Sequence, residues 1–345
     1  MIYIGLDVHV KQSYFCVMDK MGQCLGHKSM ASTEENFRDL VERYKAVGKV
    51  KVALESTSIS WWIANVLTRA GADVHVANAY QLKLIAHSKR KTDRYDSKVL
   101  ADLLRCDGLP PRVYIPSVET LQLRNLLKLR KSFVRLRTRM IVQAKAFMRQ
   151  RGEVVGSRDF YSKSSWKDIC EAKPGFGFYL APLHQFYGCV EEQIQCMDAQ
   201  AKEMIFDKDS TLELLTSIPG IGLLTGRIFM AAIGDIRRFS RSDQLVSYAG
   251  FNPSERSSGE KEQKGSISKQ GRSELREAFV QAAWAVVRSS RPDTALLKRF
   301  FYRVMHKRCS QVAAIALARK LLVIAYQVMK TEKPFESSLY LEKAA

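Results

Sequence analysis

The chain has 345 residues, of which 46% are hydrophobic and 26% are charged, so it is long enough to bury cores in two or more domains. Its formal net charge of +20 predicts a polyanionic partner, most simply a nucleic acid. The N-terminus becomes polar too early for a signal peptide, and no uninterrupted run of 18 apolar residues is present. These features argue against membrane association and predict a cytoplasmic protein.

The seven cysteines are odd in number, widely spaced and without a C-x-x-C pair. We therefore expect reduced packing residues, and neither a disulfide framework nor a zinc site. They are Cys16, Cys24, Cys106, Cys170, Cys189, Cys196 and Cys309.

Residues 1–115 are predicted to form an α/β domain. The strand-like runs cover residues 1–7, 13–19, 24–30, 50–56 and 73–78. Helical patterns cover residues 32–47, where Ser32 and Glu35 are spaced as a capping box, 60–71, closed by Gly71, and 93 onward. Strands that first follow one another and then alternate with helices predict a mixed sheet covered by helices.

The segment "KTDRYDSKVLADLL" places Asp93 and Asp96 three residues apart, on one side of the last helix of this domain. Both acids head the apolar stripe that this helix is expected to bury, whereas Asp102 should face solvent. One interpretation is helix capping by Thr92 or Asp93. The other is a metal site, because carboxylates turned inward need a cation or many hydrogen-bond donors. The stripe consists of Val99, Leu100, Leu103 and Leu104.

Two further acids, Asp7 and Glu55, end the first and fourth predicted strands. If these strands are adjacent and parallel, both carboxylates emerge at one edge of the sheet, near the acid pair. Such a cluster needs cations, and Mg²⁺ or Mn²⁺ prefers these oxygen ligands. Taken singly, Asp7 could be a turn residue and Glu55 could bind the backbone of "STS". His9 is expected to be exposed, or else to hydrogen-bond a metal ligand.

Residues 116–210 are expected to form a long basic helix and a coiled-coil region. From Gln81 to Arg151 there are 18 basic and 5 acidic side chains, a net charge of +13. A heptad row on the helix from Thr120 to Arg151 fails only at Gln143. A second row follows, and the two rows could pair with each other or between subunits. The first row is Leu126, Leu129, Phe133, Leu136, Met140 and Phe147, and the second is Val190, Ile194, Met197, Ala201 and Met204. The basic residues predicted to bind nucleic acid are Arg124, Lys128, Arg130, Lys131, Arg135, Arg137, Arg139, Lys145 and Arg149.

Residues 211–332 are expected to form a mainly helical domain, followed by a tail at 333–345. "SIPGIGLLTGRIFMAAIGDI" (217–236) has the glycines of a helix-hairpin-helix, whose turn offers backbone N–H groups to DNA phosphate. The alternative is a packing corner between two helices. A serine- and glycine-rich stretch, read as an exposed loop, precedes helices at 272–290 and 310–330. Its predicted nucleic-acid contacts are Arg256, Lys261, Lys264, Lys269 and Arg272.

The motifs "GLDVHVKQ", "ALESTS", "KTDRYDSKVLADLL", "IPGIGLLTGRIFMAAIGDIRRF", "LVSYAGFNP", "SSG" and "GSISKQGRSELR" resemble the transposases of insertion-sequence family 110. The Piv and MooV invertases are related to this family. The likeness runs in the same order from Ile4 to about Lys330 and covers two separate domains. It implies a RuvC-like domain of the ribonuclease-H-like fold, a coiled-coil region, and a transposase domain with a nucleophilic serine.

Carried over by motif, the resemblance gives Asp7, Glu55, Asp93 and Asp96 as the metal-binding catalytic acids. The serine is Ser258, with Ser257 as the alternative because the chain reads "SSG". The resemblance also implies donor and target DNA, a noncoding guide RNA of the element, and homodimers that join into a homotetramer.

The implied reaction is attack by the serine oxygen on a scissile phosphate, followed by attack of a DNA hydroxyl on the phosphoserine. A serine needs activation, and no basic residue is placed beside Ser258 by spacing, so the acid and metal cluster would supply it. Two rivals stay open: a metal-dependent nuclease that uses water, and a nucleic-acid-binding protein without catalysis. The sequence argues against a tyrosine recombinase, because the C-terminal half has no match to its Arg, His, Arg and Tyr set.

Overall fold

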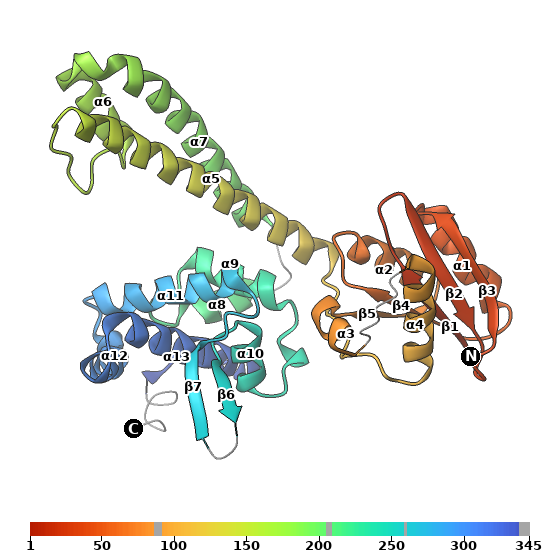
Figure 1. Ribbon diagram of the computed structural model, residues 1–345. Helices are drawn as coiled ribbons and strands as arrows, with labels where there is room; N and C mark the ends of the chain where they lie inside the picture. The colour runs from red at the N-terminus through yellow and green to blue at the C-terminus, as the bar shows by residue number, and fades with distance from the viewer. Residues whose placement is uncertain (86–91, 205–208, 259–260, 338–345) are drawn as a thin grey trace. The chain divides into compact units, whose positions relative to one another are not determined.

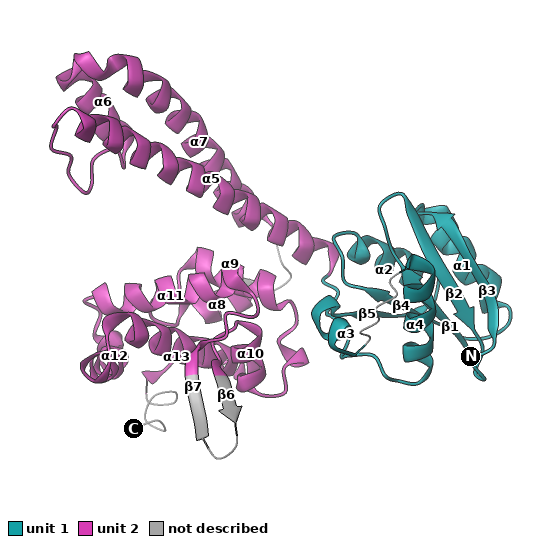
Figure 2. Cartoon of the chain, in the orientation of Figure 1, with its two compact units in different colours: residues 1–116 teal, residues 117–345 magenta. Residues whose placement is uncertain are grey.

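The computed structural model describes residues 1–85, 92–204, 209–258 and 261–337 (Figure 1). Contacts divide the chain into two compact units, residues 1–116 and residues 117–345 (Figure 2). Each unit is described by itself below. The finer division of the second unit at residues 210 and 332 stays a prediction.

The first unit is built on a five-stranded mixed sheet with the strand order β3-β2-β1-β4-β5. Its strands are β1 (Ile2–Asp7), β2 (Gln12–Met18), β3 (Cys24–Ala31), β4 (Val50–Glu55) and β5 (Asp73–Ala77). The first three form an antiparallel meander, and β4 and β5 run parallel to β1. The predicted mixed sheet is therefore confirmed.

Helices cover both faces of this sheet (Figure 1). They are α1 (Glu34–Lys45), α2 (Ser60–Arg69), α3 (Ala79–Ile85), which the sequence pattern missed, and α4 (Asp93–Arg105). The side chains of Ile4, Leu6 and Leu54 belong to one core with Phe37 of α1 and Ile63 of α2. Because side chains alternate along a strand, the residues between them face the other side of the sheet, toward α4.

The N-terminus of α1 differs from the predicted capping box. Thr33, and not Ser32, is the N-cap, and its side chain accepts a hydrogen bond from the Asn36 backbone N–H at 3.3 Å. The Ser32 hydroxyl instead donates to the His9 carbonyl at 2.6 Å. It therefore ties the residue that follows β3 to the loop between β1 and β2 rather than capping the helix.

The second unit begins with two long helices that pack side by side (Figure 1). They are α5 (Val118–Gln150) and α7 (Gly177–Glu203), with the short α6 (Lys163–Ala172) between them in the chain. The two rows thus meet within one chain. Met140 and Ala144 of α5 share a core with Val190 and Ile194 of α7. Leu129 and Leu136 are 51% and 40% exposed, so these two positions of the predicted heptad row do not pack within the chain.

Further along, helices surround a separate apolar core. They are α8 (Asp209–Thr216), α9 (Leu223–Ile233), α10 (Ser242–Tyr248), α11 (Ser273–Arg288), α12 (Ala295–Lys307), absent from the sequence prediction, and α13 (Ser310–Thr331). Short 3₁₀ turns lie at Pro174–Phe176, Ile236–Arg238 and Pro292–Thr294. The stretch predicted as a loop is instead an antiparallel hairpin of β6 (Pro253–Ser258) and β7 (Lys261–Ile267).

Within the described ranges, α13 is the one helix whose length and composition would let it cross a membrane. More than half of its apolar window is buried inside the protein. Leu317, Leu321 and Ile324 have at most 1% exposure and belong to the same core as Phe279 of α11. These contacts make α13 the central helix of a packed core.

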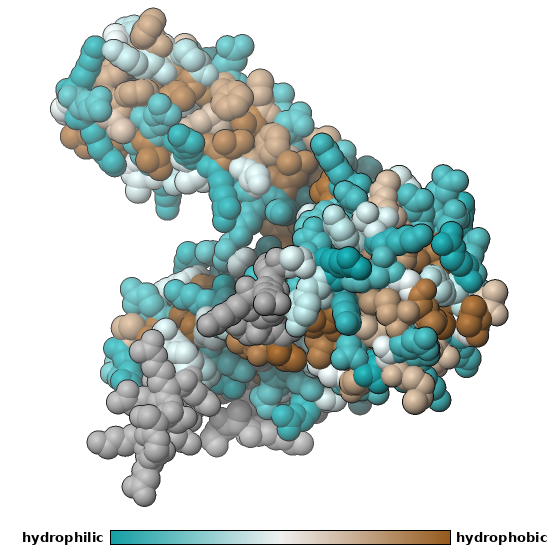
Figure 3. Space-filling model, turned by 45° about the vertical axis from the view of Figure 1, so that its right-hand side comes forward, coloured by the Kyte–Doolittle hydropathy of each residue, from teal (hydrophilic) through white to brown (hydrophobic). Residues whose placement is uncertain are grey.

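The surface of the α5–α7 pair carries exposed apolar side chains. On the α5–α7 pair, apolar atoms lie among hydrophilic ones (Figure 3), and the exposed side chains there include Leu129, Leu136 and Phe186.

Five of the cysteines are exposed, Cys170 is intermediate and only Cys16 is buried. The expectation that all seven are packing residues is therefore wrong.

Candidate active site

Two of the four predicted acids are brought together by the backbone of the sheet. Asp7 is the last residue of β1 and Glu55 is the last residue of β4. These strands are parallel neighbours in which Leu6 lies opposite Leu54, so the next residue of each strand lies at the same edge. By alternation, Asp7 and Glu55 share the face of Gly5, which α4 covers.

The local alternative for Glu55 was a bond to the backbone of the following turn. In the structure the Ser56 N–H donates to the Ala77 carbonyl at 2.9 Å. The Thr57 N–H donates to the Ser60 hydroxyl at 3.2 Å. These two amides of the turn are therefore satisfied by residues other than Glu55.

The acid pair lies in the first turn of α4, where the capping role belongs to neither acid. Thr92 is the N-cap, and its side chain accepts from the Tyr95 N–H at 3.2 Å. The buried face of the helix is turned by about one residue from the predicted stripe. It consists of Ser97, Leu100, Ala101 and Leu104. As a result Asp96 is partly buried, whereas the side chain of Asp93 is 50% exposed at the rim, contrary to the expectation that both acids turn inward.

Because α4 packs closely on the sheet, its first turn lies near the end of β1. A Cβ atom on Gly5 would lie 2.1 Å from the carbonyl oxygen of Ser97 and 2.4 Å from the backbone nitrogen of Ala101. Only a glycine in β1 allows the helix backbone to approach so closely. Asp7 is two residues beyond Gly5 on the same face and therefore lies next to the first turn of α4.

His9 bridges the acids across this contact. Its Nε2 lies 3.3 Å from Oδ2 of Asp7 and 3.8 Å from Oδ2 of Asp93. One donor atom from each of the three side chains falls within 4.8 Å of the others. The sequence left two alternatives for His9, an exposed residue or one that hydrogen-bonds a metal ligand; its side chain is 55% exposed and also contacts both carboxylates.

The electrostatics of the cluster favour an added positive charge. Burial raises the pKa of Asp7 above its usual value, and the charges of Asp93 and Asp96 raise it further, while His9 opposes the shift. Carboxylates that repel one another in a partly buried site are the ligands that a hard divalent cation takes. The donor set therefore suits a divalent metal ion held between β1, β4 and α4.

The candidate nucleophiles lie at the tip of the β6–β7 hairpin. Ser257 pairs with Glu262 and Ser258 with Lys261 in the strand register. The side chains of both serines, and of Arg256, Lys261 and Lys264, lie outside the described part of the structure.

Side-chain hydrogen bonds and one close backbone approach hold the segment after the hairpin against the end of α10. The Arg272 guanidinium donates to the Tyr248 hydroxyl at 3.0 Å, and Arg276 donates to the Ala249 carbonyl at 2.8 Å. Gly271, with φ of +137°, leaves no room for a Cβ atom, which would lie 2.3 Å from the Tyr248 carbonyl oxygen. Arg272 thus has a positioning role that its motif did not indicate, whereas Lys269 is exposed.

The basic residues of α5 separate into two groups. Five of them bind other parts of the protein. Two donate to backbone carbonyls: Arg124 to Ala231 and Ala232, and Lys145 to Gly156 and Ser157. Three form ion pairs: Arg130 with Asp198, Lys131 with Glu277, and Arg137 with Glu191. Lys145 is only 8% exposed, although the sequence placed it among the basic residues predicted to bind nucleic acid.

The other four bases, Lys128, Arg135, Arg139 and Arg149, are exposed. At ~100° per residue they fall within about 80° of one another around the helix. They form one line on the surface of α5, which we call the basic stripe.

Two family models match separate stretches of this chain. A family model described as "Transposase", for the DEDD transposases of IS110, matches residues 4–151, and the "Transposase IS116/IS110/IS902 family" model matches residues 212–298.

The relatives include the "Transposase for insertion sequence element IS1328" of Yersinia enterocolitica, 26% identical over 94% of this chain and 96% of that protein. The "Transposase for insertion sequence element IS1111A" of Coxiella burnetii is 27% identical over 71% and 68%. The "Pilin gene-inverting protein" of Moraxella bovis is 36% identical over 37% and 39%. With both family models matching in order along one chain, the protein belongs to the IS110 family of transposases.

Proposed function

We propose that this protein cuts and rejoins DNA through a phosphoserine intermediate, with the acids of the first unit holding Mg²⁺ or Mn²⁺. The observation that carries the proposal is the meeting of Asp7, His9 and Asp93 within 4.8 Å, beside Glu55 at the end of the neighbouring strand. The substrates are donor and target DNA. A noncoding RNA of the element guides the choice of target.

The proposed chemistry is a pair of exchanges at phosphorus. When bound, the divalent cations stabilise charge on the attacking and leaving oxygens. The serine Oγ forms a bond to the scissile phosphate as the bond to one deoxyribose oxygen breaks, and the serine proton passes to the released hydroxyl. A hydroxyl of another strand then attacks the phosphoserine and restores the serine. Each step exchanges one P–O bond for another, so no nucleotide cofactor is needed, and the sequence has no G-x-x-x-x-G-K-[ST] motif.

DNA contacts in the second unit are proposed at the turn between α8 and α9. A Cβ atom on Gly220 would lie 2.5 Å from the Ala282 carbonyl oxygen, so this glycine has a packing role. Gly222, the N-cap of α9, has no atom within 4 Å of a Cβ position. Its surroundings leave space for a phosphate at the helix N-terminus, as in a helix-hairpin-helix.

Assembly is proposed through the α5–α7 pair. Leu129 and Leu136 lie seven residues apart and are exposed, which gives α5 an apolar row in addition to the row that packs on α7. Such a row suits a coiled-coil contact with a second copy, and dimers formed in this way would join into a tetramer on DNA.

The test is incubation of the protein and its co-purifying RNA with DNA that carries the element junction, in the presence of Mg²⁺. We expect a protein–DNA adduct whose phosphorylated residue maps to Ser258, lost in Ser258→Ala and retained in Ser257→Ala. The reverse pattern would assign Ser257.

Cleavage by both serine variants without an adduct would support a nuclease that uses water. DNA binding with no cleavage, unchanged by Asp7→Asn, would reduce the protein to a binding module.

A further inference from the structure

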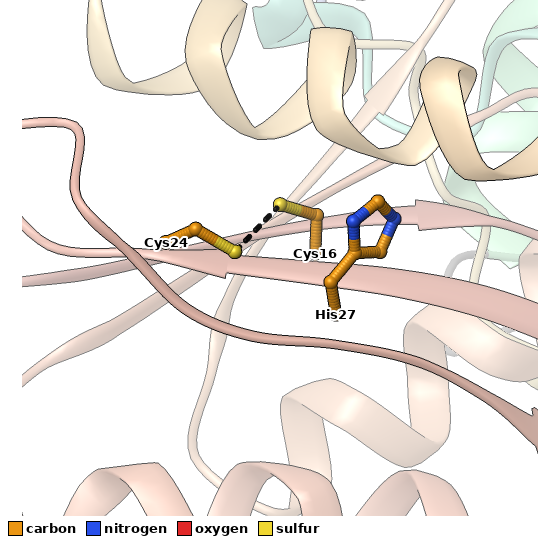
Figure 4. A group of neighbouring side chains, drawn as sticks. All are labelled: Cys16, Cys24 and His27. Carbon is orange, nitrogen blue, oxygen red and sulfur yellow. Dashed lines mark hydrogen bonds between the residues drawn. The ribbon is translucent and has the colours of Figure 1, made fainter.

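A second group of metal-ligating side chains lies on the sheet away from the carboxylates. Cys16 of β2 lies opposite His27 of β3, and Cys24 lies opposite Met18, where the pairing of the two strands is irregular. The three side chains gather in the space between these strands and α4 (Figure 4). None of them takes part in the chemistry proposed above.

The distances among these atoms fit a single thiophilic ion. The two sulfur atoms lie 4.0 Å apart, and one donor atom from each residue falls within 4.8 Å of the others. With Zn–S bonds of ~2.3 Å, two sulfurs on one tetrahedral zinc ion stand about 3.8 Å apart. The sulfurs therefore need to move by only a few tenths of an ångström to share a zinc ion.

His27 is oriented as a metal ligand. Its Nε2 lies 3.2 Å from the hydroxyl of the buried Ser97, which itself donates to the Arg94 carbonyl at 3.1 Å. Ser97 therefore accepts a hydrogen bond from Nε2–H, and the lone pair is left on Nδ1. In Figure 4 the other ring nitrogen, Nδ1, lies on the side of the ring toward Cys16. A hydrogen bond to the nitrogen that does not bind the metal is the usual support of a histidine ligand.

The surrounding charges and burial are compatible with a metal ion. Burial, followed by the charge of Arg94, lowers the pKa of His27, which keeps the ring in its neutral, metal-binding form. Arg94 Nε lies 3.5 Å from Nδ1, but this side chain is exposed and can swing into solvent. Burial, followed by the charge of Cys24, raises the pKa of the Cys16 thiol, and the charge of exposed Lys98 opposes this shift without cancelling it. Cys16 is fully buried and Cys24 is exposed, so an ion can enter from the side of Cys24.

A disulfide fits the same atoms less well. It would require the two sulfurs to approach from 4.0 Å to ~2.05 Å, and it would not involve the imidazole of His27. Burial, together with Cys24, raises the pKa of the Cys16 thiol to about 12, which depletes the thiolate that disulfide exchange needs. A bound cation displaces that proton directly.

We propose that Cys16, Cys24 and His27 bind one Zn²⁺ ion, with water as the fourth ligand. Binding forms two Zn–S bonds and one Zn–N bond and releases two protons from the thiols. The ion links β2 to β3 and, through the hydrogen bond of His27 to Ser97, which itself donates to the Arg94 carbonyl, holds the N-terminal part of α4. It thereby supports the helix that carries Asp93 and Asp96, while the carboxylates themselves take a harder cation.

The test uses Co²⁺ as a spectroscopic probe on the reduced, full-length protein. We expect one equivalent of Co²⁺ to give a sulfur-to-cobalt charge-transfer band and tetrahedral d–d bands, both abolished by one equivalent of Zn²⁺. Cys24→Ser, an exposed position, should fold normally, lose most of the charge-transfer intensity and bind Zn²⁺ ~10–100-fold more weakly. His27→Gln should weaken binding to a similar extent and shift the d–d bands.

Two controls separate this site from the rest of the protein. Cys106→Ser removes an exposed thiol at the C-cap of α4 and should leave the bands and the affinity unchanged. Asp7→Asn should also leave them unchanged, because the band reports on thiolate ligands alone. A charge-transfer band that survives Cys24→Ser, or reduced protein that gives no such band, overturns the proposal.

Discussion

Gly5 of β1 lies directly against the backbone of Ser97 in α4, so closely that a Cβ atom on Gly5 would be 2.1 Å from the Ser97 carbonyl oxygen. This contact sets the height of α4 above the sheet. Through it, a residue without a side chain controls how near Asp93 and Asp96 come to Asp7. The position of the proposed catalytic acids is therefore set by backbone packing as much as by their own interactions.

Gly5→Ala is expected to destabilise the first unit by about 3 kcal/mol or more, because the added methyl group meets backbone atoms that cannot move aside. Thermal unfolding of the variant should show a clear loss of stability together with a loss of strand-transfer activity. Gly48→Ala is the matched control, since the nearest atom to its Cβ would be the Met1 nitrogen at 3.4 Å, an ordinary contact. Equal stability of the two variants would contradict the close approach of α4 to β1.

Asp7→Asn is expected to abolish activity and yet raise the unfolding temperature at pH 7 in the absence of divalent cations. The pKa of Asp7 is raised in the folded state, so the native protein holds this proton more tightly than the unfolded chain does. The resulting stability is present below pH 3.8, the value for the unfolded chain, and is lost as pH rises through the higher folded pKa. At neutral pH the ionised Asp7 lowers the free energy of unfolding of the wild type, and asparagine does not have this effect.

Two further measurements check this cause. Adding Mg²⁺ should stabilise the wild type and leave Asp7→Asn unchanged, and below pH 3.8 the two proteins should converge. Asp73 is the contrasting control, because its hydrogen bonds to Arg112 at 2.6 and 3.0 Å lower its pKa. This pair adds stability above pH 3.8 that is lost as pH falls through the lowered pKa, so Asp73→Asn should destabilise at pH 7, by up to about 1 kcal/mol for an exposed pair.

The basic stripe on α5 is expected to bind nucleic acid through phosphate. Replacing its four bases with glutamine should weaken binding and reduce the slope of log affinity against log salt by up to about 3.6, since each phosphate contact on duplex DNA contributes ~0.9. A variant with the same loss of charge elsewhere, at exposed Lys20, Lys28, Arg43 and Lys49, should retain the slope. An unchanged slope in the stripe variant would assign the nucleic-acid contacts to another surface.

Lys145 should behave in the opposite way. Lys145→Met removes the ammonium group that donates to the Gly156 and Ser157 carbonyls at 3.0 and 2.9 Å, and leaves those carbonyls without this donor. We expect a loss of about 2–4 kcal/mol in unfolding free energy, with no change in the salt slope. A reduced slope with unchanged stability would instead place Lys145 among the phosphate contacts.

The sheet and its acids could be predicted because the short apolar runs in the sequence show where each strand ends. Asp7 and Glu55 lie at two of those ends. The contact between α4 and β1 could not, because nothing in a local pattern shows that Gly5 faces a helix backbone. Leu129 and Leu136 of the heptad row are exposed within the chain because an α-helix drifts by ~20° per heptad against a strict seven-residue repeat. The meeting of Cys16 with Cys24 depends on the register of β2 and β3, which includes an irregularity after Val17.

Asp7 and Glu55 end two hydrogen-bonded parallel strands, so about 4.8 Å of ladder spacing separates their backbones, whatever side chains fill the core beneath. Substitutions at apolar positions of this unit can therefore alter its melting temperature while leaving the gap between the two carboxylates almost unchanged. The apolar core positions of this unit can therefore change during evolution, provided that Asp7 and Glu55 are kept at the ends of their strands.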